Sequence, residues 1–342
     1  MTSSTDYTLG RYSRAFLTNE PSLVGNIIFI ALFAVLIPLA LGLGVKYRSS
    51  VFATTITTGL ALEVVGYVGR FLLRDNPTGR TDFILFLVGT ILGPAFICGA
   101  IFLVMPHIVT VYGDDFRSWR PVWYQLLLYA LTAASIVLEL AGGLVSTMQD
   151  TRVKADIGIH VLTTGLAIQL VSLAIFVGHA VLFAIAVRTR HHALDIKFAG
   201  IYNSGSFKTF LLAFSFATCL LVVRTAFRTV VIAEGYDSSI AQSETLLFIL
   251  DGLMVLLATL ILLAFFPGRI LGQSWSQASS HRVSRALPER IQAPPYELPS
   301  AQSSPTYNRM GTKHPVVSYS PKKSNYTESL PQRNLVDHEA LW

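Results

Sequence analysis

Charged residues are scarce in this sequence. Of its 342 residues, 13% are Asp, Glu, Lys or Arg, while 52% are hydrophobic and the mean hydropathy is +0.54. Soluble domains carry about 25% charged residues. The shortage of charge therefore indicates an integral membrane protein.

Several motifs that identify other protein classes are missing. The chain has no Gly-Lys pair, hence no GxxxxGK[ST] phosphate loop, which excludes an ATPase pump of that kind. The last apolar segment, 245–266, has no lysine, which excludes a retinal Schiff base. His107, His160 and His179 lie at different depths on two segments, whereas a metal site needs converging ligands. No Ser-His-Asp or Cys-His arrangement is present, so we expect no enzyme, no metal and no cofactor.

Long apolar segments are abundant instead. A membrane-spanning helix needs about 20 apolar residues, and a barrel strand has about ten residues of alternating polarity. Nothing in the chain alternates in that way. The predicted fold class is all-α, a polytopic membrane protein with a seven-transmembrane-helix bundle and a disordered C-terminal tail. The seven candidate spans are 22–45, 51–73, 82–107, 122–146, 157–187, 207–233 and 245–266.

The chain divides into three predicted parts. Residues 1–21 are polar and form a short extracellular N-terminus, which is not a cleaved signal because the apolar run that follows is too long. Residues 22–267 form the helical domain. Residues 268–342 contain eight of the 15 prolines and are predicted to be a disordered cytosolic tail. The tail could contact anionic lipid or carry phosphorylation or sorting signals.

The orientation is predicted from lysine and arginine in the segments between spans. With the N-terminus outside, six such residues lie outside and eleven lie inside, which fits the positive-inside rule. The predicted localisation is an integral membrane protein, in the plasma membrane or an endomembrane. The cytosolic set is Lys46, Arg48, Arg117, Arg120, Arg188, Arg190, Lys197, Lys208, Arg269, Arg282 and Arg285.

Ionisable residues inside the spans are the candidate site. Arg224 and Arg228 are one helical turn apart and face the same way. Three acids, Glu63, Glu139 and Asp251, lie at similar depth on other spans. Charges at such depth face a bundle interior and pair with one another, so we expect the arginines to meet these acids. The remaining candidates are Tyr67, Arg70, Gln169 and Glu244.

Two interpretations of this charge network remain open. It could be a structural ion-pair network that fixes helix register, or the floor of an outward-facing polar cavity that binds the head group of an amphiphile. Gln169 could join helices or line that cavity, and Glu244 suits a helix N-terminus.

Several short motifs lie along the spans. Their residues are Glu63, Gly66, Tyr67, Arg70, Gly165, Gln169, Arg224, Phe227, Arg228, Gly235, Glu244, Phe248, Asp251, Met254, Pro267 and Gly268. Over about residues 22–268 they resemble the E-x-x-G-Y-x-x-R, G-L-x-x-Q, R-x-x-[YF]-R and G…E-x-x-x-Y-x-x-D-x-x-M patterns and the closing H-P-G of the fungal lipid-translocating exporter family, the seven-span family named for resistance to aminocholesterol.

The sequence also departs from the family pattern. Thr132 and Glu139 stand where the family usually has Asp and Gln, and Val231 stands where it usually has Glu. Phe248 replaces a usual Tyr. The acids have moved, which leaves open whether the substrate is that of better-known members.

The resemblance implies a function in lipid traffic. Members are linked to movement of sphingoid long-chain bases, to phospholipid asymmetry, to resistance to amphiphilic toxicants and, in one branch, to porphyrins. An ammonium head group would find counter-charges in Glu63, Glu139 and Asp251. We therefore predict an exporter of lipids or amphiphiles without ATP hydrolysis; the alternative is a seven-span lipid-sensing receptor. The predicted partners are membrane lipids or amphiphilic small molecules and no nucleic acid, and the oligomeric state is left open.

Overall fold

The structure is a computed structural model that describes residues 21–112, 121–148, 152–189, 199–236 and 238–271. All regular elements within these ranges are helical, and seven helical segments are long and apolar enough to cross a membrane. The predicted all-α fold with seven spans is confirmed. The elements are α2 (Leu23–Lys46), α3 (Ser50–Leu72), α4 (Arg80–Tyr112), α5 (Pro121–Met148), α6 (Arg152–Thr189), α7 (Ala199–Tyr202), α8 (Gly205–Ala233), α9 (Glu244–Leu246), the π-helix η4 (Leu247–Leu253), α10 (Met254–Ala264) and α11 (Pro267–Leu271).

The helices form a closed ring. Contacts join α2 to α3, α3 to α4, α4 to α5, α5 to α6, α6 to α8, α8 to α10, and α10 back to α2. Helix α4 also touches α6 and α8, and it is the most buried of the seven spans. It is therefore the ring member that lies deepest inside the bundle.

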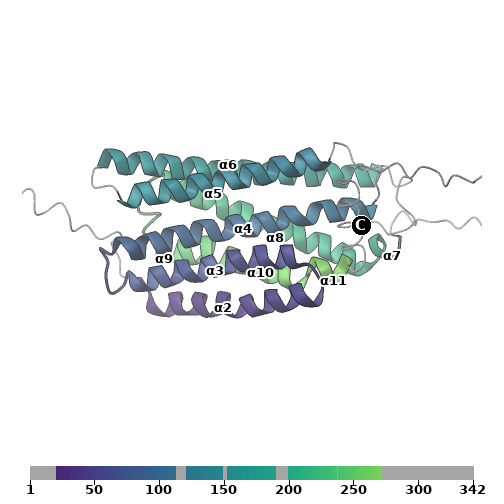
Figure 1. The fold of residues 1–342 in the computed structure, drawn as a ribbon, viewed down its shortest axis with the longest axis horizontal. Helices are drawn as coiled ribbons and strands as arrows, with labels where there is room; N and C mark the ends of the chain where they lie inside the picture. The colour runs from purple at the N-terminus through teal and green to yellow at the C-terminus, as the bar shows by residue number, and fades with distance from the viewer. Residues whose placement is uncertain (1–20, 113–120, 149–151, 190–198, 237, 272–342) are drawn as a thin grey trace, which may run out of the picture.

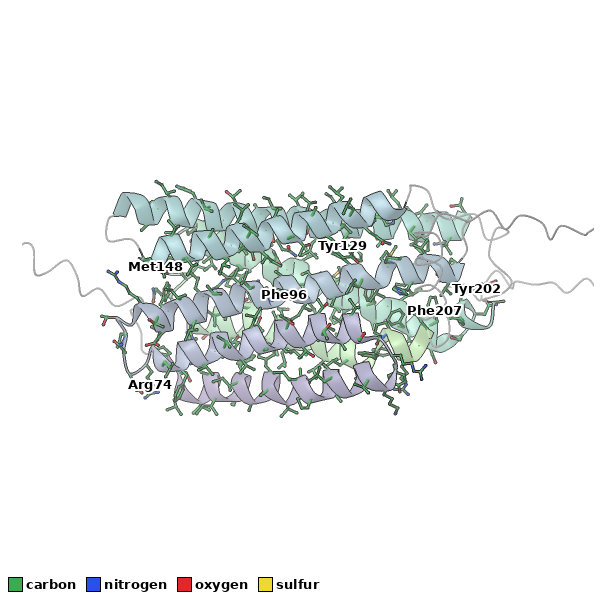
Figure 2. The ribbon with its side chains drawn as sticks, in the orientation of Figure 1. Arg74, Phe96, Tyr129, Met148, Tyr202 and Phe207 are labelled. Atoms are coloured by element: carbon green, nitrogen blue, oxygen red, sulfur yellow. The ribbon has the colours of Figure 1, made fainter. Side chains whose placement is uncertain are left out.

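The two ends of the bundle differ in content. We call one of them the Ser22 end, where the backbone N–H of Ser22, Arg70 of α3 and Glu244 of α9 meet. It lies on the left in Figure 1, and Arg74 and Met148 mark it in Figure 2, with Tyr202 and Phe207 at the opposite end. Aromatic side chains fill the opposite half, and they include Phe102, Tyr112, Phe176, Phe183, Tyr202, Phe207, Phe210 and Phe214.

Large apolar side chains cover the outside of the ring. Val35, Leu182 and Leu212 are each more than half exposed, as are other residues along α2, α5, α6 and α8. Exposing so much apolar area to water would be energetically unfavourable, whereas contact with lipid tails is not. The outer surface is therefore suited to a bilayer, in line with the seven spans.

Glycines set the closest helix contacts. Gly66 of α3 lies against Gly89 and Thr90 of α4, and Gly142 of α5 lies against Gly158 and Leu162 of α6. Small residues at such crossings let two helix backbones approach, which strengthens packing in membranes. The two helix pairs α3–α4 and α5–α6 are held in this way.

Replacing Gly142 with alanine tests this packing. The added methyl group would lie within 3.0 Å of the α6 backbone, and overpacking of this kind costs about 1–3 kcal/mol. Gly178→Ala is the matched control, because nothing lies within 4 Å of that position and alanine favours the helix by about 1 kcal/mol. Thermal unfolding in detergent should show Gly142→Ala less stable than wild type and Gly178→Ala unchanged or more stable. Equal stability of the two variants would contradict the proposed contact.

The structure bears on one of the two predicted boundaries of the helical domain, the one at residue 267. Helix α11 begins at Pro267 and its residues Pro267, Gly268 and Leu271 are buried, so the packed structure continues past the predicted boundary at 267. The predicted N-terminal segment before Pro21 and the predicted tail after Leu271 lie outside the described residues.

Candidate functional site

The buried ionisable residues share one depth in the bundle. Glu63, Glu139 and Arg224 each lie nine residues before the last residue of α3, α5 and α8, respectively. At 1.5 Å per residue this is about 13 Å from the helix ends. Asp251 lies seven residues after Glu244, the first residue of α9. All four are at most 2% exposed, so the bundle holds a polar layer in its Ser22 half.

Asp251 is the acid that pairs with both arginines. Arg224 Nε donates to Asp251 Oδ1 at 2.5 Å, and Arg228 Nη1 lies 3.6 Å from Asp251 Oδ2. Buried charges need such pairing because unpaired ones lose their hydration without compensation. One carboxyl thus joins two successive turns of α8.

Thr90 of α4 provides the second contact for both arginines. Arg224 Nη2 donates to the Thr90 carbonyl oxygen, and Arg228 Nη2 donates to Thr90 Oγ1 at 3.2 Å. A helix carbonyl normally accepts from the N–H four residues later, but that residue is Pro94, which has none. Pro94 therefore leaves the Thr90 carbonyl open to Arg224. Sequence reasoning missed Thr90, although the proline four residues on was the available signal.

The helix that carries Asp251 is wound as a π-helix, η4. Such short widened turns inside α-helices are frequent at functional sites. Next to Asp251, Gly252 has no side chain, and the Tyr67 hydroxyl and the Phe29 ring lie where its Cβ would be. Tyr67 stacks on Phe29 with ring centroids 5.0 Å apart. Tyr67 is thereby held beside the charge layer with a hydroxyl that has no hydrogen-bond partner within the described structure.

Glu63 and Glu139 belong to the layer without a direct ion pair. Within the described ranges, no lysine or arginine nitrogen lies within 4.0 Å of either carboxyl. Glu63 still interacts electrostatically with Asp251, Arg224 and Arg228, and Glu139 interacts with Arg224. The predicted meeting of arginines and acids thus takes two forms: direct contact with Asp251 and longer-range interaction with the other two.

Glu139 is connected to α6 through Ser135. The Ser135 hydroxyl is the donor to Gln169 Oε1 at 2.8 Å and to Glu139 Oε1 at 3.4 Å. Glu139 Oε2 and Gln169 Nε2 are buried without a hydrogen-bond partner among the described residues. Gln169 therefore lies at the edge of the charge layer, with unused hydrogen-bonding capacity next to a carboxyl.

Arg70 and Glu244 form a separate pair nearer the Ser22 end. Arg70 Nη2 lies 3.3 Å from Glu244 Oε1, which also accepts from the backbone N–H of Ser22 at 2.7 Å. The Arg70 guanidinium covers the rings of Phe86 and Phe248 at 5.2 and 5.6 Å. Glu244 is 29% exposed in its side chain, unlike the buried acids. The structure thus separates these two candidates from the deeper cluster.

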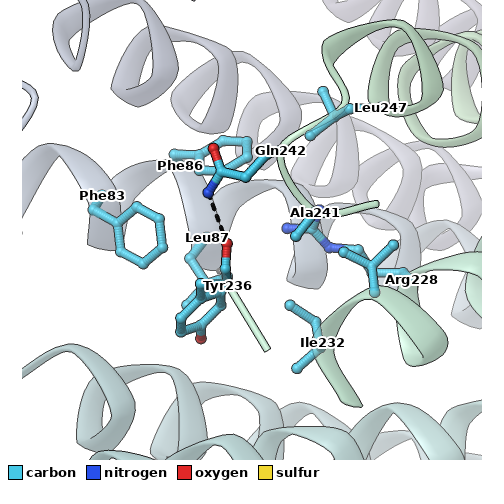
Figure 3. A pocket seen from close by; sticks show the side chains of 10 residues that line it. Phe83, Phe86, Leu87, Arg228, Ile232, Tyr236, Ala241, Gln242 and Leu247 are labelled. Carbon is cyan, nitrogen blue, oxygen red and sulfur yellow. Dashed lines mark hydrogen bonds between the residues drawn. The ribbon is translucent and has the colours of Figure 1, made fainter. Parts of the chain in front are cut away.

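A small cavity lies between the cluster and the 234–243 connection. Its volume is about 20 Å³, enough for water but not for a head group. Phe83, Phe86, Arg228 and Tyr236 are among the residues that line it (Figure 3). Arg228 Nε has no hydrogen-bond partner in the described structure.

Tyr236 fixes the connection over this cavity. Its hydroxyl lies 3.0 Å from Ser146 Oγ of α5, its ring meets Phe83 edge-on, and its carbonyl accepts from Gln242 Nε2 at 2.7 Å (Figure 3). Burial raises the pKa of the Tyr236 hydroxyl, which keeps it neutral. Through Tyr236, the connection therefore contacts both α4 and α5 next to the cavity that Arg228 lines.

Comparisons with known proteins give one family and several curated relatives. A family model described as "RTA1 like protein" matches residues 56–274. The chain is 27% identical over 277 residues to "Sphingoid long-chain base transporter RSB1" of Saccharomyces cerevisiae (strain Lalvin EC1118 / Prise de mousse), with 72% of each chain covered. It is 25% identical over 210 residues to "Protein RTA1" of S. cerevisiae (strain ATCC 204508 / S288c), which covers 61% of this chain and 63% of that protein.

A third curated relative is named for a different role. "Protoporphyrin uptake protein 1" of S. cerevisiae (strain ATCC 204508 / S288c) is 25% identical over 230 residues, with 66% of this chain and 72% of that protein covered. No solved structure matches the chain.

Proposed function

Because the chain belongs to the RTA1-like protein family, we propose that it moves a cationic amphiphile of the sphingoid-base kind across a membrane without ATP hydrolysis. The observation that carries this proposal is the buried layer with three carboxyls and two guanidiniums. The layer has one more carboxyl than it has guanidiniums, and the ammonium head group of a bound amphiphile can supply the third positive charge. One relative is named as a sphingoid long-chain base transporter, and this similarity supports the proposed substrate class.

The proposed site assigns a role to each candidate residue. Glu63, Glu139 and Asp251 are the counter-charges of the head group, while Arg224 and Arg228 hold Asp251 in place. Tyr67 and Gln169 have buried polar atoms without partners in the described structure, which can bind the hydroxyl groups of a sphingoid base. Arg70 and Glu244 lie between this layer and the Ser22 end and form the rim of the site.

Entry of the head group requires the helices to separate. The cavity beside Arg228 has a volume of about 20 Å³, which a water molecule can occupy. The exposed apolar outer surface lets an alkyl chain stay in lipid while the head group passes between helices. In the proposal, the described structure is the closed state of the transporter.

Flux through reconstituted protein tests the proposal. Liposomes containing the purified protein and a fluorescent sphingoid base are mixed with a membrane-impermeant quencher, and the rate at which inner-leaflet probe becomes accessible is measured. We expect a faster rate than in protein-free liposomes, and little change for an anionic probe of equal chain length. Binding without flux would favour the lipid-sensing receptor instead, and neither binding nor flux would reject both.

We further propose that the Ser22 end faces outside, in the plasma membrane. The support is the excess of lysine and arginine in the segments at the opposite end. A tag after Trp342 should resist protease added to intact cells, and a tag before Ser22 should be cleaved. The reverse pattern would invert the orientation and place the charge layer near the cytosolic face.

A further inference from the structure

The buried layer has an excess of acids. Arg224 and Arg228 contribute two positive charges, and Glu63, Glu139 and Asp251 contribute three negative charges if all are ionised. All five are at most 3% exposed, and a net charge in such surroundings is unfavourable. With one carboxyl protonated, the empty layer is neutral.

A bound monovalent cation changes this count. Three positive charges then face three carboxyls, and the layer is neutral only when all three carboxyls are ionised. Resting on the proposed function, we propose that Glu139 carries a proton in the empty site and releases it when the cationic head group binds. The protein then exchanges one proton for one cationic amphiphile, which supplies an energy source other than ATP.

The contacts single out Glu139 among the three acids. Asp251 touches both arginines. Glu63 and Glu139 have no direct ion pair among the described residues. Of these two acids, Glu139 is the one whose carboxyl contacts a hydroxyl, that of Ser135, which can accept from the protonated acid and donate to the ionised one.

The hydrogen bonds around Ser135 fit a protonated Glu139. A hydroxyl has one hydrogen to donate, and the shorter of the two Ser135 contacts is the one to Gln169 Oε1, 2.8 Å against 3.4 Å. With its hydrogen given to Gln169, the Ser135 oxygen can accept from a protonated Glu139. After proton release, the hydroxyl can turn to the Glu139 carboxylate, and a rotated Gln169 amide can donate its Nε2 hydrogen to Ser135. Ser135 and Gln169 thus serve both protonation states.

Several groups from neighbouring helices face the Glu139 carboxyl, which holds the proton in the empty site. Arg224 approaches from α8, and the Cys98 thiol interacts with Glu139 from α4. Helix α6 presents Gln169 and the backbone at Gly165. The step itself breaks the carboxyl O–H bond and passes the proton to water on the side from which the head group arrives, so no electrons are transferred.

Proton release on binding is the decisive measurement. The probe is a sphingoid base with a trimethylated nitrogen, whose charge is permanent, so that the ligand itself neither takes up nor loses a proton. The full-length protein is titrated with it in detergent, in weakly buffered solution with a pH indicator. We expect about one proton released per base bound by wild type, the same for the exposed control Glu234→Gln, and none for Glu139→Gln.

The outcomes separate this inference from the proposed function. Binding by wild type without proton release would overturn proton exchange and leave the transporter proposal standing. Proton release that persists in Glu139→Gln would overturn the assignment to Glu139. Absence of binding to wild type would overturn the proposed function and this inference together.

Discussion

Replacing Arg224 with methionine is expected to destabilise the protein by about 3–5 kcal/mol, because breaking a buried ion pair leaves its other member uncompensated. Asp251 would keep only Arg228, whose Nη1 lies 3.6 Å away. The Thr90 carbonyl, which lacks its helical donor because of Pro94, would also lose its partner. Arg228→Ala should have a smaller effect, because Asp251 then keeps its 2.5 Å contact with Arg224.

A double substitution and a control complete this test. Asp251→Asn in the Arg224→Met background removes the unpaired charge and should restore part of the stability, which a double-mutant cycle in detergent would measure. Arg74→Met is the control, since Arg74 is exposed at the Ser22 end (Figure 2). If Arg224→Met unfolds at the same temperature as Arg74→Met, the Arg224–Asp251 pair does not stabilise the bundle.

Substituting Glu63 by glutamine is expected to lower flux of a cationic sphingoid base by about tenfold to a hundredfold. The amide keeps the shape of the side chain but removes one counter-charge, and a hydrogen bond to a charged group contributes about 1.5–3 kcal/mol. Glutamine fits beside Gly93, whose missing Cβ leaves room for Glu63, so the fold should survive. Liposome flux measurements with the same protein amounts would give the ratio.

Glu234→Gln provides the comparison for Glu63→Gln. Glu234 is exposed after the end of α8, so the same chemical change there should leave flux at the wild-type rate. A Glu63→Gln protein that folds and transports normally would show that this carboxyl is a structural member of the layer. That result would favour the interpretation in which the charges only fix helix register.

Much of the fold follows from the sequence because bilayer thickness limits the length of apolar segments. Counting residues along the spans also placed Arg224, Glu63 and Glu139 at one depth, since every helix advances by the same rise per residue. Depth does not decide which acid an arginine touches. That choice depends on the rotation of α8 and on the π-helical turn at Asp251, and neither leaves a periodic signal in the sequence.

The contacts that the sequence did not predict involve backbone and small side chains. Arg224 binds a carbonyl oxygen of Thr90, and Glu139 reaches Gln169 through Ser135. Patterns of charged residues do not reveal backbone acceptors. The Thr90 carbonyl could have been anticipated only by asking which carbonyl Pro94 leaves without a donor.

The pairing of Arg224 with Asp251 has a consequence for biogenesis. The chain is made from its N-terminus, so Arg224 and Arg228 leave the ribosome before Asp251, which follows Arg224 by 27 residues. During that interval α8 must be inserted without its final partner. The acids already delivered to the membrane are Glu63 and Glu139, on helices made earlier, and they can hold the arginines until the last helix arrives. Substitutions of these two glutamates should therefore be examined for the yield of inserted protein as well as for transport.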